Sequence, residues 1–117
     1  MKPDIDYLKR LLDACESSED ATFTIRDLEG RGVVVVAGSE FIFHLELLHD
    51  RGLIEGATSS RSLGFSRGNG GITWSVVPLR LTAAGHDFAA SLREPTVVNA
   101  IKEKAGEVGF STLIQVA

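Results

Sequence analysis

The sequence predicts an α+β fold, and three observations support this prediction. Residues 39–56 join an amphipathic helix of about three turns to a glycine stop and a short apolar strand. An amphipathic pattern near the N-terminus precedes this stretch. After it, two β-prone runs flank a loop rich in glycine and serine, and further helical patterns follow. This order is typical of a winged helix-turn-helix-like domain with a two- or three-stranded wing and extra C-terminal helices.

We expect a single domain over residues 1–117, because a chain of this length builds one core. Residues 1–94 would form the core with its wing at 53–81, and residues 95–117 a C-terminal helical extension. Hydrophobic residues make up 44% and charged residues 24%, as in ordinary globular proteins. The longest apolar run, residues 33–37, is too short to cross a bilayer, and no signal-peptide core is found. A cytoplasmic protein without membrane contact is therefore expected.

Apolar residues recur at helical spacing near the N-terminus, at Ile5, Leu8, Leu12 and Cys15. This spacing predicts a helix over residues 3–17. Cys15 falls on the buried stripe, so we expect a packed thiol rather than a reactive one. A single cysteine forms no internal disulfide, which fits a reducing compartment.

The second helix of the domain is difficult to locate from the sequence. Residues 33–36 are four valines bounded by glycines, which favours a strand, and residues 22–25 form a shorter β-prone run. Residues 26–30 have room for only a turn of helix. The second helix is therefore either replaced by strands or very short.

The central helix follows at residues 39–51. Ser39 is predicted as its N-cap, and Phe41, Leu45 and Leu48 face the core. Gly52 supplies the left-handed conformation that ends the helix.

The wing is predicted from two strands, residues 53–57 and 72–81, and from the loop between them. Pro78 cannot donate to a ladder and marks an edge or the distal end of the second strand. The loop, residues 58–71, has four glycines and four serines and is expected to be the wing tip. It leads into a strand and not a helix, which argues against a phosphate-binding loop.

Two further helices are predicted after the wing. Thr82 is a natural N-cap for the first, whose core residues would be Phe88, Ala89 and Leu92. The second begins at Pro95 or Thr96. Its apolar face has Val97, Val98, Ile101 and Ala105, and one or two further apolar turns have Phe110, Leu113 and Ile114.

These motifs resemble two known groups of proteins. The central run is similar to the H-L-x-x-L-x-x-x-G-L-[IV] signature of winged-helix regulators of the arsenic-repressor and multiple-antibiotic-resistance types, at His44, Leu45, Leu48, Gly52, Leu53 and Ile54. Nearly the whole chain, except residues 19–38 and the wing tip, resembles an uncharacterised domain-of-unknown-function family of bacteria and their prophages. Phe43 and His44 stand where that family has Tyr-His, Val98 replaces its usual Trp, and the matching residues include Gly85, His86, Phe88, Arg93, Thr96, Val97, Asn99, Ile101 and Lys102. The resemblance implies a winged-helix fold in a phage or mobile-element setting.

The sequence offers no arrangement of residues that catalysis would require. His44 and His49 lie on different helix faces, and no cysteine or acidic cluster completes a zinc site. His86 with Asp87 is most simply explained by helix capping and an exposed polar surface. We therefore expect no enzymatic activity, no metal and no cofactor.

The distribution of charge suggests where nucleic acid could bind. The net charge is −4, yet residues 57–86 have three arginines and no carboxylate: Arg61, Arg67 and Arg80. Phosphate contacts would be made there, as in a DNA-binding transcriptional regulator of a phage or mobile element that dimerises through its C-terminal helices. The alternative is that these arginines are merely solvated on a loop.

The central helix favours a different partner. Outside its core stripe it would present Glu40, Phe43, His44, Glu46, Leu47, Asp50 and Arg51, and three acids against one base would repel a duplex. A phage-derived interaction module is the alternative, with an acidic face that binds or inhibits a host protein such as a defence component. Phe43 and Leu47 could instead be buried under the N-terminal helix or residues 22–37.

Overall fold

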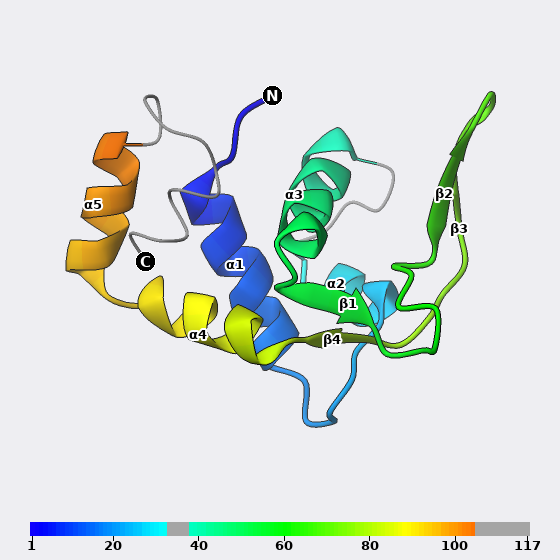
Figure 1. Ribbon diagram of the computed structural model, residues 1–117, viewed down its shortest axis with the longest axis horizontal. Coiled ribbons are helices and arrows are strands. Elements are labelled where there is room, and N and C mark those ends of the chain that lie inside the picture. The colour runs from blue at the N-terminus through cyan, green and yellow to red at the C-terminus, as the bar shows by residue number, and fades with distance from the viewer. Residues whose placement is uncertain (33–37, 105–117) are drawn as a thin grey trace.

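A computed structural model describes residues 1–32 and 38–104, whose helices and strands form an α+β fold, as expected (Figure 1). The elements are α1 (Ile5–Glu16), α2 (Ile25–Gly30), α3 (Ser39–Asp50), β1 (Ile54–Gly56), β2 (Phe65–Gly68), β3 (Gly71–Trp74), β4 (Leu79–Leu81), α4 (Ala83–Ser91) and α5 (Pro95–Lys104). None of the helices in these residues has the length and apolar composition that a membrane span requires.

The strands form two small antiparallel sheets, β1 with β4 and β2 with β3. The second strand of the predicted wing is therefore divided: residues 71–74 pair with β2, while residues 79–81 pair with β1. The break ends at Pro78, whose carbonyl accepts the Ala57 N–H at 2.8 Å. The β2–β3 hairpin occupies part of the predicted wing tip and projects beyond the helices in Figure 1.

A third segment joins the β1–β4 sheet through Phe23, which lies between α1 and α2. Phe23 and Leu79 form an antiparallel bridge, in which each N–H donates to the other carbonyl, at 3.0 and 2.7 Å. The β-prone run expected at residues 22–25 is thus represented by a single bridging residue next to β4.

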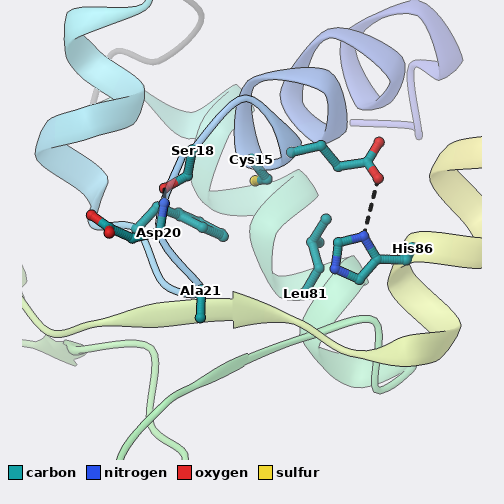
Figure 2. Close-up of a pocket in the computed structure, with 8 residues that line it drawn as sticks. Cys15, Ser18, Asp20, Ala21, Leu81 and His86 are labelled. Atoms are coloured by element: carbon teal, nitrogen blue, oxygen red, sulfur yellow. Dashed lines mark hydrogen bonds and ion pairs between the residues drawn. The ribbon is translucent and has the colours of Figure 1, made fainter.

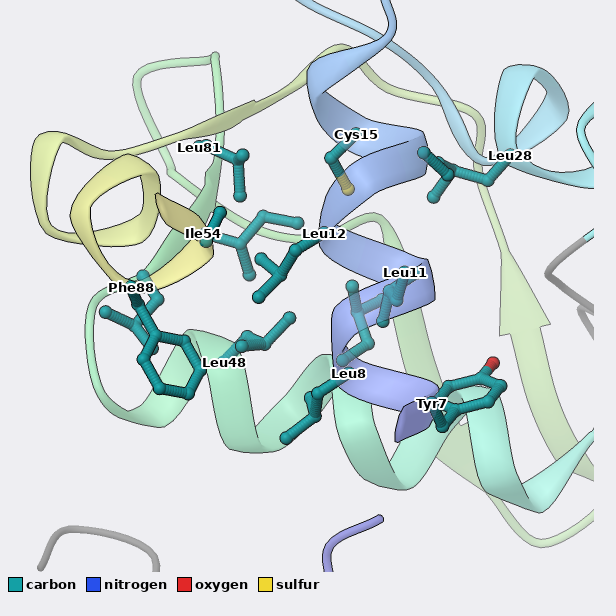
Figure 3. Close-up of a cluster of buried hydrophobic side chains, with 14 of the residues drawn as sticks. Tyr7, Leu8, Leu11, Leu12, Cys15, Leu28, Leu48, Ile54, Leu81 and Phe88 are labelled. Carbon is teal, nitrogen blue, oxygen red and sulfur yellow. The ribbon is translucent and has the colours of Figure 1, made fainter. Parts of the chain in front are cut away.

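The hydrophobic core is built around α1, with side chains of α2, α3 and α4 on its sides (Figure 3). All four residues of the predicted α1 stripe are buried. So are the core residues predicted for α3, namely Phe41, Leu45 and Leu48, and those predicted for α4, namely Phe88, Ala89 and Leu92. The helical periodicity in the sequence therefore identified these core faces correctly.

The second helix is very short, which was one of the two alternatives. Thr24 caps α2: its hydroxyl accepts the Asp27 N–H at 3.4 Å, and the Asp27 carboxylate accepts the Thr24 N–H at 2.8 Å. This reciprocal capping box satisfies amides that a six-residue helix otherwise leaves unpaired. The strand expected at residues 33–36 lies outside the described residues.

The ends of α3 and α4 were predicted with mixed success. Gly38, in an extended conformation, is the N-cap of α3, so the prediction of Ser39 as the cap is wrong and Ser39 is already helical. Gly52 has a φ of +68° and ends α3 as expected. Thr82 caps α4, accepting the Gly85 N–H at 3.1 Å.

Helix α5 begins at Pro95, one of the two predicted start points. Ile101 is fully buried, and Val97 and Val98 pack partly against the core. Ala105 and the apolar turns expected around Phe110, Leu113 and Ile114 lie outside the described residues.

Candidate interaction surface

The predicted interaction face of α3 divides by burial. Glu40 and Asp50 are exposed, and Phe43, Glu46 and Leu47 are half-buried. The two apolar residues are thus neither free in solvent nor covered by the body of the protein. Together these five residues form a partly apolar surface with three carboxylates.

His44 does not belong to this surface, because its side chain is only 1% exposed. The Asp4 N–H donates to Nε2 at 2.8 Å, and Nδ1 lies 2.7 Å from the Glu40 carbonyl oxygen. A neutral imidazole with its proton on Nδ1 satisfies both contacts. The imidazole ring also lies 4.7 Å from the Tyr7 ring, centroid to centroid. His44 therefore fastens the start of α1 to the first turn of α3.

The sequence contained a signal for this structural role. His44 is three residues after Phe41 and four before Leu48, so it lies beside the apolar stripe of the helix. The polarity of histidine led to its prediction as a surface residue, although helical position placed it against α1.

The β2–β3 hairpin packs against one side of α3. Its register places Phe65 opposite Trp74 and Arg67 opposite Ile72. Side chains at these paired positions share one face of the hairpin. Trp74 stacks on Phe41 of α3, with ring centroids 5.9 Å apart, and contacts the Phe65 ring in a tilted arrangement at 4.9 Å. The hairpin thus turns its apolar face toward the helix.

A groove of about 280 Å³ lies between α3 and the hairpin, hereafter the α3–hairpin groove. The α3–hairpin groove contains apolar side chains beside a carboxylate, and its lining residues are Met1, Ser39, Ile42, Phe43, Glu46, Arg67 and Ile72. A neighbouring hollow of about 300 Å³ shares Glu46 with this groove and is also lined by His49, Asp50 and Phe65, among others.

Two of the three arginines predicted to lie in a wing have carboxylate partners within the protein. Arg67 of β2 forms an ion pair with Glu46 of α3. Arg80 of β4 forms one with Glu55, which lies directly opposite it on β1. Arg61 has a positive φ of 56° in the loop before β2, and among residues 1–32 and 38–104 no carboxylate pairs with it. The three arginines therefore lie on separate segments.

A separate cavity, of about 160 Å³, lies between the end of α1 and the start of α4 (Figure 2). Cys15, Glu16 and His86 are among its lining residues, a combination that invites comparison with a nucleophile, base and acid. Burial raises the pKa of Cys15 to about 12, so the thiol stays protonated at neutral pH. This is the reverse of what a nucleophile requires, and the expectation of a packed thiol is confirmed.

His86 connects two helices rather than capping one. Its Nδ1 lies 3.0 Å from a Glu16 carboxylate oxygen, the contact drawn as a dashed line in Figure 2. Arg93 binds the other oxygen of the same carboxylate. The sequence interpretation, capping and surface polarity, missed this contact because Glu16 lies 70 residues earlier in the chain.

No group of three or more His, Cys, Asp or Glu residues suitable for a metal ion occurs in the described part of the chain. The fold and surface define an α+β protein with an exposed groove between a helix and a hairpin. Comparison with protein families is more specific: residues 2–111 match the family described as Hypothetical protein (DUF2513), and the chain belongs to it. The expected membership of a domain-of-unknown-function family is confirmed. Searches of curated proteins and of solved structures found no match.

Proposed function

We propose that this protein is a winged-helix-like binding module without catalytic activity, and that the α3 surface formed by Glu40, Phe43, Glu46, Leu47 and Asp50, beside the α3–hairpin groove, engages another protein. The order of elements supports the winged-helix assignment. Helix α1, the bridging residue Phe23, the short α2, the central α3 and an antiparallel ribbon follow one another as in that architecture. The hairpin would then be the distal part of the wing.

The main support for a protein partner is the chemistry of the α3 surface. Phe43 and Leu47 offer half-buried apolar area beside Glu40 and Asp50, which are exposed. Arg51 is the one cation that α3 itself places beside this surface, and Arg67 of the hairpin is already paired with Glu46. A duplex would meet carboxylates there, and its wet groove would gain nothing from apolar side chains. A protein segment that combines basic and apolar residues complements the surface.

A comparison of two charge-reversed variants tests this proposal. Glu40→Lys with Asp50→Lys reverses the exposed charge on α3 while leaving the Arg67–Glu46 pair intact. Glu19→Lys with Asp20→Lys makes the same change in net charge in the exposed segment after α1. Each protein is immobilised and exposed to extracts of bacterial and phage-infected cells, and each captured protein is then purified and titrated against all three forms.

We expect a partner that binds the wild type and the Glu19 and Asp20 variant equally, with affinity for the α3 variant reduced at least about tenfold. A partner that binds all three forms alike would place its interface elsewhere and contradict the proposal. The alternative from the sequence, a phage-derived module that inhibits a host protein, is one form of this function.

The second candidate is a DNA-binding transcriptional regulator of a phage or mobile element. It is supported by the same order of elements and by the exposed Arg61 in a segment without carboxylates. In this function Arg61, Arg67 and Arg80 would contact phosphates, and residues 95–117 would form a homodimer. Binding to mixed duplex DNA across a salt series tests it: a steep loss of affinity with salt supports DNA binding. No binding at low salt would exclude it.

A further inference from the structure

Strand β3 pairs with β2 along one edge, and its other edge has no strand partner among residues 1–32 and 38–104. The Ser75 N–H donates to the Gly64 carbonyl at 2.6 Å, so the antiparallel ladder continues one position beyond β3. Hydrogen-bonded positions alternate along such a ladder. The backbone groups of Thr73 and Ser75 therefore face β2, and those of Ile72 and Trp74 face the opposite edge. Continuing the same alternation by one residue would turn the backbone groups of Val76 to that edge as well. Within the described residues, no backbone group bonds to that edge.

This edge lacks the charged side chains that often prevent strand pairing. Residues 68–79 contain no charged side chain, whereas native edge strands are commonly protected by charges. Ile72 and Val76 are large apolar residues that remain 36% and 49% exposed. Pro78 cannot donate a hydrogen bond, so it limits any added pairing to the residues before it.

We propose that β3 pairs antiparallel with β3 of a second copy of this chain, about a twofold axis at Trp74. This register sets Ile72 opposite Val76 of the second copy and Thr73 opposite Ser75. The outward-facing backbone groups of Ile72, Trp74 and Val76 then become the hydrogen-bonded positions of the new ladder. The segment from 72 to 76 is self-complementary, apolar against apolar and polar against polar, as an isologous interface requires.

The pairing joins two hairpins into one four-stranded sheet. It would also enlarge the apolar wall of the α3–hairpin groove. Ile72 lines that groove, so Val76 of the second copy would extend its apolar wall. The contact involves few residues, so it is smaller than most permanent interfaces. We expect a dissociation constant on the order of 100 μM, within the range of weak, reversible association.

Sedimentation equilibrium of the full chain from about 5 μM to 1 mM tests the proposal. Val76→Lys sets a charge against Ile72 of the second copy, and Ile72→Glu sets one against Val76. Each change occurs twice in a symmetric dimer, so each variant should associate at least about tenfold more weakly than wild type. Ser66→Lys adds a charge to exposed β2, away from the β3 edge, and should leave association unchanged.

An equimolar mixture of the two variants tests the register itself. In a mixed dimer the introduced glutamate of one copy lies opposite the introduced lysine of the other, and the remaining Ile72 lies opposite the remaining Val76. The mixture should therefore associate more strongly than either variant alone. The opposite pair of substitutions, Ile72→Lys and Val76→Glu, repeats the test if either first variant fails to fold, as judged by circular dichroism.

A wild-type protein that stays monomeric to 1 mM overturns the proposal. So does a dimer that both single variants retain, since its interface would lie elsewhere, for example in residues 95–117. Variants that weaken association without recovery in the mixture reject the proposed register. These results are independent of the protein partner proposed above, whose binding is measured with changes on α3.

Discussion

His44 uses both ring nitrogens: Nε2 accepts the Asp4 N–H at the start of α1, and Nδ1 bonds the Glu40 carbonyl within α3. His44→Leu keeps the apolar bulk but leaves the Asp4 N–H without its partner. We expect the free energy of unfolding to fall by about 1–3 kcal/mol, the cost of an unsatisfied buried group. Urea denaturation measures it, with His49→Leu as the control in the same helix. His49 is exposed, so its substitution should change stability by less than about 0.5 kcal/mol. Equal effects would contradict the role of His44.

Cys15 predicts a dependence of stability on alkaline pH. Burial raises the pKa of its thiol from an ordinary value of 9.0 to about 12. Between these values the unfolded thiol loses its proton while the folded thiol keeps it, so stability falls as pH rises through this window. The slope is at most about 1.4 kcal/mol per pH unit. Urea titrations from pH 8 to 10.5 should show this extra slope in wild type and not in Cys15→Ala; parallel slopes would contradict it.

Among the helices and strands, the sequence predicted correctly those features that depend on neighbouring residues in the chain, such as the buried face of a helix. The spacing of apolar residues located the buried faces of α1, α3 and α4, because a helix repeats every 3.6 residues wherever it lies. The break between β3 and β4 was missed although alternation of apolar and polar side chains stops at Val77 and Pro78 and resumes at Leu79, because neither run shows which strand it pairs with. Register with a distant strand is a tertiary property.

The candidate surface shows the same difference between local patterns, which the sequence reveals, and tertiary contacts, which it does not. The sequence placed Glu40, Phe43, Glu46, Leu47 and Asp50 correctly outside the core stripe. It did not predict that Arg67 and Arg80 would have carboxylate partners. Those pairs join residues 21 and 25 positions apart, and only the folding of the hairpin onto α3 and of β4 onto β1 brings them together.

The junction of α4 with β1 depends on Gly85. A methyl group at this position would overlap the Leu53 carbonyl oxygen. Alanine normally favours a helix by about 1 kcal/mol over glycine, but this overlap should outweigh the gain. We expect Gly85→Ala to lower the free energy of unfolding by about 1–3 kcal/mol. The control is Gly30→Ala in α2, where nothing lies within 4 Å of the added methyl, and its stability should stay level or rise. A stabilising Gly85→Ala would show that the junction can relax.

Across the whole molecule, ion pairs tie the C-terminal helices to α1. The Glu16 carboxylate pairs with His86 of α4 and with Arg93, which follows α4. The Asp6 carboxylate pairs with Lys102 of α5, with 2.9 Å between Oδ1 and Nζ. Helix α1 is therefore held on one side by charged pairs and on the others by the core (Figure 3). The hairpin is attached differently, through the Trp74–Phe41 stack, the exposed Arg67–Glu46 pair and the buried Leu63.

This difference in attachment predicts that the hairpin separates from α3 before the core unfolds. An exposed ion pair contributes at most about 1 kcal/mol, and an isolated hairpin is only marginally stable. Trp74 is the single tryptophan of the chain and reports on the hairpin, whereas far-UV circular dichroism reports on the helices. At low protein concentration, the fluorescence transition in urea should therefore precede the dichroism transition.

Two substitutions identify the cause of that separation. Arg67→Gln removes the pair between the hairpin and α3 and should move the fluorescence midpoint to lower urea while the dichroism midpoint changes little. Arg80→Gln removes a comparable pair inside the β1–β4 sheet and should not widen the gap between the two transitions. If both probes gave the same midpoint in the wild type, the hairpin would unfold together with the core. The α3–hairpin groove would then be a fixed part of the fold, and a partner would meet it already formed.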